Sequence, residues 1–145
     1  MIRILALSLL LAAPARAAPG VSDAWIRSNA VPGRPAAGYL TLTGGSQPDT
    51  LVSVTSPRLR IEVHSTTTDG GVMKMAKRDT LPIPAGAKVA LATGGNHLMI
   101  FGLASAAKAV PLTLAFRSGA KVATLAEVRA PAAAAPDPHA GHAQH

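Results

Sequence analysis

The sequence predicts an all-β domain, an antiparallel Greek-key β-sandwich, and three observations indicate this fold class. Short apolar runs alternate with a period of two, as where Leu112, Leu114 and Phe116 share one face and Thr113 and Ala115 the other. Clusters of Gly and Pro separate such runs at regular spacing. No stretch after residue 20 shows the periodicity of an amphipathic helix. A single β-domain is therefore expected.

Nine strands are expected in chain order, each bounded by residues that break regular structure. The expected strands are 22–27, 38–43, 50–56, 60–66, 72–77, 88–92, 97–103, 112–117 and 121–128. The breakers between them are 32–35, 44–45, 69–71, 82–86, 94–95 and 118–119. Ser118 and Gly119 stand between two alternating runs, which predicts a tight hairpin there.

Residues 1–17 have the pattern of a cleaved bacterial signal peptide. Arg3 supplies the positive start, residues 4–13 form an apolar run, and Ala15 and Ala17 flank Arg16 as in a signal-peptidase site. The apolar run is much shorter than the ~20 residues that a membrane-spanning helix needs. A lone membrane anchor is the alternative. The sequence thus predicts an exported, periplasmic protein without stable membrane insertion.

Charge and cysteine content narrow the functional classes. The net charge of +7 becomes +5 when Arg3 and Arg16 are removed. The remaining Lys and Arg are scattered and aromatic residues are few, which argues against a nucleic-acid partner. The positive charge is therefore interpreted as serving solubility or steering toward an acidic partner. The chain has no cysteine, so thioether and imidazole are its softest metal donors. The seven acidic residues lie far apart and suggest no catalytic carboxylate pair.

His64, Met75, His97 and Met99 form a candidate set of soft-metal ligands. Thioether and imidazole together suit Cu(I) far better than Mg²⁺ or Ca²⁺, which prefer oxygen. On an extended strand His97 and Met99 project from the same face, since they are two residues apart. A single Met is usually core filler, and a single His is usually a satisfied or exposed polar residue. The joint pattern in an exported chain without cysteine favours a copper site.

The positions of Met73 and His64 leave more than one interpretation. Met73 shares a strand face with Met75; it could replace Met75 or take part in transfer, and a packing role is the favoured one. His64 is expected near the end of strand 60–66, just before the glycine-containing turn 69–71. Strand ends and turns meet at the edge of a sandwich, where functional residues concentrate.

Six short segments carry a family resemblance: DAWIR at 23–27, AGYLTL at 37–42, EVHSTT at 62–67, GVMKM at 71–75, GNHLM at 95–99 and VPLTL at 110–114. With the spacing His64-x10-Met75-x21-His97-x-Met99, the chain resembles the periplasmic copper chaperones called PCu(A)C over about residues 21–129. Phe101 departs from many relatives, which carry Met there, but that position is outside the usual ligand set.

The resemblance implies a cupredoxin-like β-sandwich that binds one Cu(I) through two His and two Met. It further implies delivery of that copper to haem-copper (cytochrome c) oxidase assembly, with an oxidase subunit or a Sco-type copper protein as the acceptor. On this interpretation residues 18–130 form the copper-binding domain, and the protein is not an enzyme, because a thioether-rich site favours Cu(I) and resists redox cycling. The alternatives are a periplasmic copper-buffering or resistance protein and a metal-free sandwich interaction module.

Residues 131–145 are a candidate second metal-binding segment. They contain Ala, Pro and His and no apolar residue larger than alanine, which predicts a disordered tail. His139, His142 and His145 recur every third residue, and such imidazoles bind Cu(II), Ni(II) or Zn(II) readily, with Cu(II) favoured by the general affinity order. A solubilising tail and an adventitious metal binder remain the alternatives.

Overall fold

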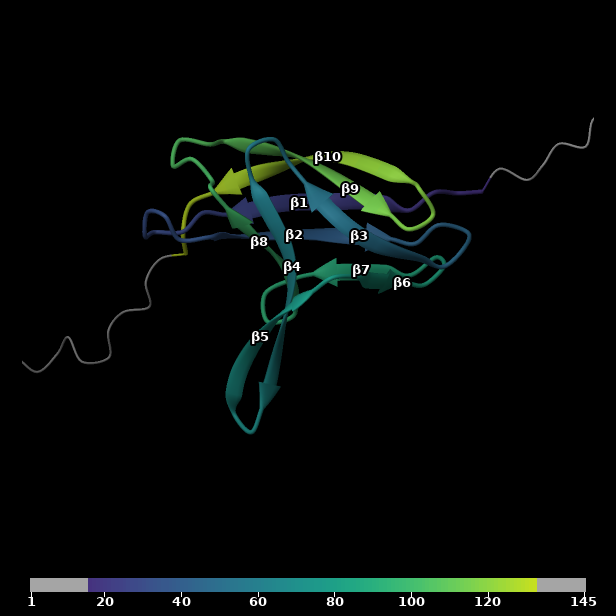
Figure 1. The fold of residues 1–145 in the computed structure, drawn as a ribbon, viewed down its shortest axis with the longest axis horizontal. Helices are drawn as coiled ribbons and strands as arrows, with labels where there is room; N and C mark the ends of the chain where they lie inside the picture. Colours follow the sequence, from purple (N-terminus) through teal and green to yellow (C-terminus); the bar gives the residue numbers. More distant parts are fainter. Residues whose placement is uncertain (1–15, 133–145) are drawn as a thin grey trace, which may run out of the picture.

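The computed structural model describes residues 16–132, and this range contains strands and no helix. Ten strands are present: β1 (Gly20–Arg27), β2 (Ala36–Thr43), β3 (Asp49–Thr55), β4 (Arg60–Asp69), β5 (Val72–Arg78), β6 (Leu81–Ile83), β7 (Lys88–Leu91), β8 (Asn96–Phe101), β9 (Ala109–Phe116) and β10 (Lys121–Arg129). They form one sheet in the order β5-β4-β8-β2-β1-β10-β9-β3-β6, with β7 paired to β2 (Figure 1). The predicted all-β class is confirmed.

Two features of the sheet differ from the sequence prediction. The sheet is antiparallel except that β1 and β10 run parallel, with Trp25 opposite Glu127. Strand β6 was not predicted because Pro82 was interpreted as part of a break. Its flanking residues Leu81 and Ile83 are buried while Pro82 is exposed. The strand lies at one edge of the sheet, where proline is tolerated because its missing N–H faces no partner strand.

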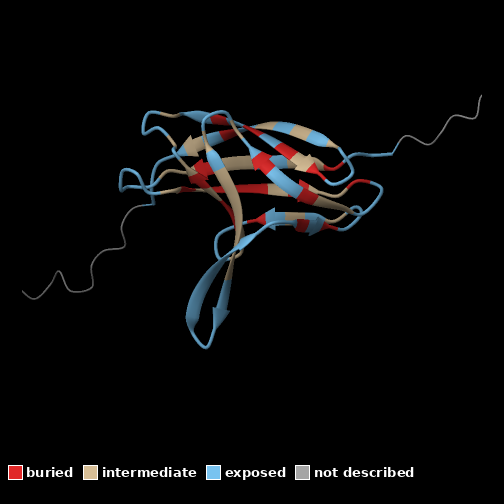
Figure 2. Cartoon of the chain, viewed as in Figure 1, coloured by how far each residue is buried: buried red, intermediate tan, exposed pale blue. Residues whose placement is uncertain are grey.

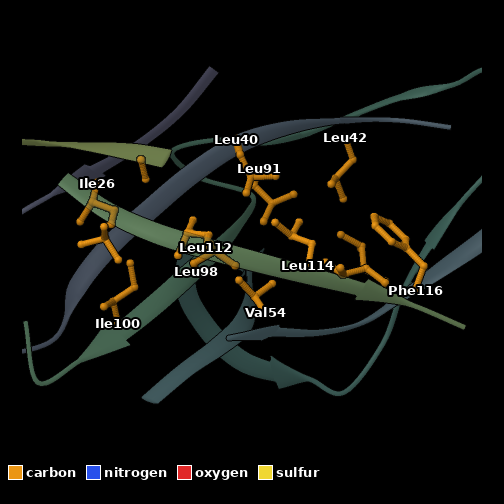
Figure 3. Packing of buried hydrophobic residues seen from close by; sticks show 14 of the residues in the cluster. Ile26, Leu40, Leu42, Val54, Leu91, Leu98, Ile100, Leu112, Leu114 and Phe116 are labelled. Carbon is orange, nitrogen blue, oxygen red and sulfur yellow. The ribbon is translucent and has the colours of Figure 1, made fainter. Parts of the chain in front are cut away.

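The core lies between the two halves of the curled sheet (Figures 2 and 3). Leu112, Leu114 and Phe116 of β9 all point into it, as their alternation predicts. Leu98 and Ile100 of β8 are fully buried, so the remaining face of β8 is free to carry other chemistry. Burial of these side chains removes apolar surface from water, the main favourable contribution to folding.

The hairpin between β9 and β10 forms at the predicted turn. The amide of Phe116 donates to the carbonyl of Ala120 at 2.9 Å, and Gly119 adopts a φ of 92°, which favours glycine. Asp49 fastens this turn to the start of β3, because its carboxylate accepts hydrogen bonds from the Ser118 hydroxyl and, at 3.1 Å, from the Ser118 amide. The hydroxyl hydrogen bond holds the pKa of Asp49 below its ordinary value.

Strands β4 and β5 form a hairpin that projects from the body of the domain (Figure 1). Strand β4 continues to Asp69, three residues beyond the predicted end, because Thr66, Thr67 and Thr68 pair with β5. Every residue of β5 is exposed, and β5 is an edge strand of the sheet. His64 therefore lies within a long strand rather than near its end, which corrects the sequence-based expectation.

The predicted signal peptide 1–17 lies outside the described residues except for residues 16 and 17. The predicted tail 131–145 lies outside them except for residues 131 and 132. Within residues 16–132, no helix has the length and apolar character needed to cross a bilayer.

Candidate metal centre

The two candidate histidines face each other across neighbouring strands. His64 of β4 is the direct cross-strand partner of His97 of β8, and their ring centroids are 6.0 Å apart. With metal–nitrogen bonds of about 2.0 Å, two imidazoles on one ion hold their ring centroids roughly 5–6 Å apart. The imidazole pair is therefore spaced for a shared metal ion. This opposition follows from strand register and not from their distance of 33 positions along the sequence.

The two candidate methionines lie on the same sheet face as the histidines. Met75 is opposite Thr66, which is two residues beyond His64 on β4, and paired residues share a face. Met99 is two residues beyond His97 on β8. Met75, His97 and Met99 line one pocket of about 400 Å³, together with Tyr39, Thr66 and Gly94. The structure thus brings three predicted ligands to one pocket, and the fourth, His64, lies beside them.

Hydrogen bonds hold both imidazoles in place. The Nε2 atom of His64 is 2.9 Å from Oε2 of Glu62, and the Nδ1 atom of His97 is 3.2 Å from the carbonyl oxygen of Gly95. Both residues are well covered, because His97 is 7% exposed and the His64 side chain is 16% exposed. Ligands held in this way need little rearrangement to bind a metal.

Glu62 is a residue of this centre that sequence reasoning missed. It precedes His64 by two positions, so both side chains project from the same face of β4. The hydrogen bond from His64 lowers the pKa of Glu62 below its ordinary value, and the positive charges of Arg60 and Lys77 act in the same direction. The Glu-x-His spacing within a predicted strand was the available signal.

Met73 does not have the predicted packing role. Its side chain is 68% exposed, and it lies opposite Thr68 near the end of the projecting hairpin. Met75 is also largely exposed, at 56%. The face that carries the candidate ligands thus grades from the covered His97 to methionines that are open to solvent.

The aromatic side of the pocket is built by cross-strand stacking. Tyr39 lines the pocket and stacks on Trp25, with ring centroids 4.7 Å apart. Arg129 and Arg27 lie over the Trp25 ring at 4.6 and 5.1 Å from its centroid. These contacts hold the Trp25 and Tyr39 rings together at the wall of the pocket.

Two other kinds of metal-binding group were considered: clusters of His, Asp and Glu in the domain, and the histidines of the tail. Among residues 16–132, no group of three or more His, Asp and Glu side chains is placed to hold a metal. Met75 and Met99 add thioether donors to the imidazole pair on this face. His139, His142 and His145 lie outside the described residues, so a Cu(II) site there stays a prediction.

Comparison with known proteins gives a consistent family and fold. The model of a family described as "Putative lipoprotein LpqE-like" matches residues 20–128. "Putative lipoprotein Lxx21020" of Leifsonia xyli subsp. xyli is 30% identical over 112 residues, covering 73% of this chain and 68% of the relative.

Two solved structures illustrate the similarity of fold. A copper-bound PCuAC domain from PmoF2 superposes with a TM-score of 0.64 at 23% identity, covering 81% of this chain and 97% of that domain. The solution structure of CuI-DR1885 from Deinococcus radiodurans gives a TM-score of 0.54 at 29% identity, covering 83% and 81%. The chain therefore belongs to the LpqE-like family and has the fold of PCuAC domains.

Proposed function

We propose that this chain is a copper carrier that binds one Cu(I) through His64, Met75, His97 and Met99. The observation that carries the proposal is the cross-strand imidazole pair, with two thioethers on the same sheet face around one pocket. Two imidazoles and two thioethers match the preference of Cu(I) for soft and borderline donors. The copper-bound PCuAC domain and CuI-DR1885, which share this fold, support the choice of metal.

The exposure gradient across the site suits a carrier. His97 is covered and held by its hydrogen bond to Gly95, so it serves as a fixed ligand. Met75 is exposed on the projecting hairpin, so it is the ligand that leaves first when a partner's donor approaches from the open side. Copper then passes through an intermediate that both proteins coordinate, without being released into solution.

We further propose that the protein is exported to the periplasm and delivers copper to haem-copper oxidase assembly. The lipoprotein description of the family and of its relative supports export. The acceptor is an oxidase subunit or a Sco-type protein, and the chain acts as a carrier and not as an enzyme. The exposed Met75 favours transfer over long-term storage.

Anaerobic Cu(I) titration against a chromophoric chelator tests the metal site. Chains with and without residues 131–145 are both expected to bind one tight equivalent, which Met99→Ile removes. Met73→Ile is the matched control, because it removes a thioether on the same face from outside the proposed ligand set. The absence of tight uptake in the truncated chain would overturn the proposal. In a separate Cu(II) titration of the same two chains, extra Cu(II) bound only by the longer chain would assign a Cu(II) site to the histidines of the tail.

Deletion of the gene separates delivery from buffering. Loss of oxidase activity at low copper, restored by added copper, is the result expected for delivery. Copper sensitivity with normal oxidase activity would instead indicate a buffering or resistance protein.

A further inference from the structure

The hydrogen-bond partner of His64 determines which of its ring nitrogens is free. An ionised carboxylate only accepts hydrogen bonds, so the 2.9 Å contact with Glu62 requires a proton on Nε2 of His64. In the neutral ring the lone pair is then on Nδ1. A metal ion binds that lone pair, because a protonated ring nitrogen has none to offer.

The hydrogen-bond partner of His97, the carbonyl oxygen of Gly95, selects the other tautomer. The carbonyl oxygen of Gly95 is also only an acceptor, so the proton of the neutral His97 ring lies on Nδ1 and the lone pair on Nε2. The two facing imidazoles are therefore held in different tautomers. Their free nitrogens differ even though the residues are direct cross-strand partners.

Glu62 is itself held by a chain of contacts that links β4 to β8. Its other oxygen forms an ion pair with Arg60, and the Arg60 guanidinium lies 3.7 Å from the centroid of the Phe101 ring. The side chain of Glu62 is only 17% exposed, so water competes weakly for its oxygens. The carboxylate is thus oriented from one side by Arg60 and from the other by His64.

We propose that Glu62 is a positioning residue that presents Nδ1 of His64 to Cu(I), while Gly95 presents Nε2 of His97. This inference rests on the proposed copper site and deepens it. Without Glu62 the His64 ring samples both tautomers and rotates, so part of the population offers the wrong nitrogen. Loss of a partner that orients a metal ligand typically weakens metal binding by about 10–100-fold.

The test combines nitrogen NMR of the histidine rings with Cu(I) affinity, using the ¹⁵N-labelled chain. Cu(I) has a closed d shell and leaves the spectra sharp, so each ring nitrogen can be followed before and after loading. The variants are Glu62→Ala, which removes the acceptor, and Glu62→Gln, whose amide oxygen still accepts from Nε2. Glu127→Ala and Glu127→Gln are matched controls. Like Glu62, Glu127 forms an ion pair with an arginine two residues away, but its cross-strand partner is Trp25 and, among residues 16–132, it has no histidine to orient.

In the wild-type apo chain, Nε2 of His64 and Nδ1 of His97 are expected to carry protons, and Cu(I) should shift the other nitrogen of each ring. Glu62→Ala should mix the tautomers of His64 and weaken Cu(I) binding by about 10–100-fold, while Glu62→Gln keeps the tautomer and most of the affinity. The Glu127 variants should match wild type.

Three results would overturn the inference: a proton on Nδ1 of His64 in the apo chain, unchanged affinity in Glu62→Ala, or equal losses in Glu62→Ala and Glu62→Gln. The last result would assign the effect to charge and not to orientation. If the wild-type chain binds no Cu(I), the proposed function fails, yet the apo spectra still report whether Glu62 and Gly95 set the two tautomers.

Discussion

Replacement of Met75 by leucine should remove copper binding while leaving the fold intact. Leucine keeps an apolar side chain of similar size but has no sulfur to donate. Met75 is 56% exposed, so little of it packs against other residues. Substitutions at such positions usually change the free energy of unfolding by less than about 0.5 kcal/mol. The melting temperature (Tm) of the apo variant should therefore lie within about 2 °C of wild type.

The copper-loaded proteins should differ much more. Free Cu(I) buffered at 100 times the wild-type Kd stabilises the folded state by about 2.7 kcal/mol. The unfolding entropy is about 2.1 cal/mol/K per residue, which over the roughly 110 residues from Gly20 to Arg129 gives about 0.23 kcal/mol/K. The wild-type Tm should thus rise by about 12 °C with copper. A variant that binds 100-fold more weakly gains only about 2 °C under the same conditions.

Anaerobic scanning calorimetry with a Cu(I) buffer measures both quantities in one experiment. Met73→Leu is the control, since Met73 is an exposed methionine on the same strand and should keep the full copper shift. A copper shift in Met75→Leu equal to that of wild type would show that Met75 is not a ligand. A fall of several degrees in the apo variant would show instead that Met75 supports the fold.

Three further predictions concern the scaffold. Leu114→Ala removes a fully buried side chain and should lower the unfolding free energy in urea by about 2.7–5.0 kcal/mol, with one Cu(I) still bound by the folded fraction. Asp49→Asn should cost about 1 kcal/mol at neutral pH in urea titrations. The hydrogen bond from the Ser118 hydroxyl lowers the pKa of Asp49 below 3.8, so its contribution to the unfolding free energy is fully present above pH 3.8. The contribution is lost as the pH falls through the lowered pKa, and Asp49→Asn should not show this loss of stability. Gly44→Ala places a Cβ 2.0 Å from the Pro84 carbonyl oxygen and should lower stability by about 1–3 kcal/mol in thermal melts, whereas Gly20→Ala, with its nearest atom at 3.9 Å, should not.

Alternation along the sequence predicts the faces of a strand well but does not predict its neighbours. The period of two places His97 and Met99 together, and Leu98 and Ile100 in the core, as observed. The opposition of His64 and His97 depends on the register between β4 and β8, which is set by tertiary packing. The parallel pairing of β1 with β10 likewise leaves no local signal in either strand.

The errors have local physical causes. Residues 82–86 were assigned to a break, so β6 was missed; proline seldom occurs within a central strand, whereas β6 is an edge strand. Met73 was assigned a packing role because methionine usually fills gaps in cores. Its exposure comes from the position of β5, which has no strand on its outer side and projects from the sheet. The sequence predicted a strand at 72–77, but its residue pattern did not show that both faces of this strand are solvated.

The parallel pairing of β1 and β10 also sets the orientation in which the domain meets its surroundings. Strand β10 ends at Arg129, which is the cross-strand partner of Arg27 on β1. Arg27 is in turn paired with Ala37 on β2, and Ala37 is paired with Met99 on β8. Three strand spacings, or roughly 14 Å, thus separate this exit from Met99. Gly20 lies at the other end of β1, roughly 23 Å farther along the strand direction. A protein tethered through residues ahead of Gly20 would hold the pocket at the far end from its tether, while any segment after Arg129 would begin beside the pocket.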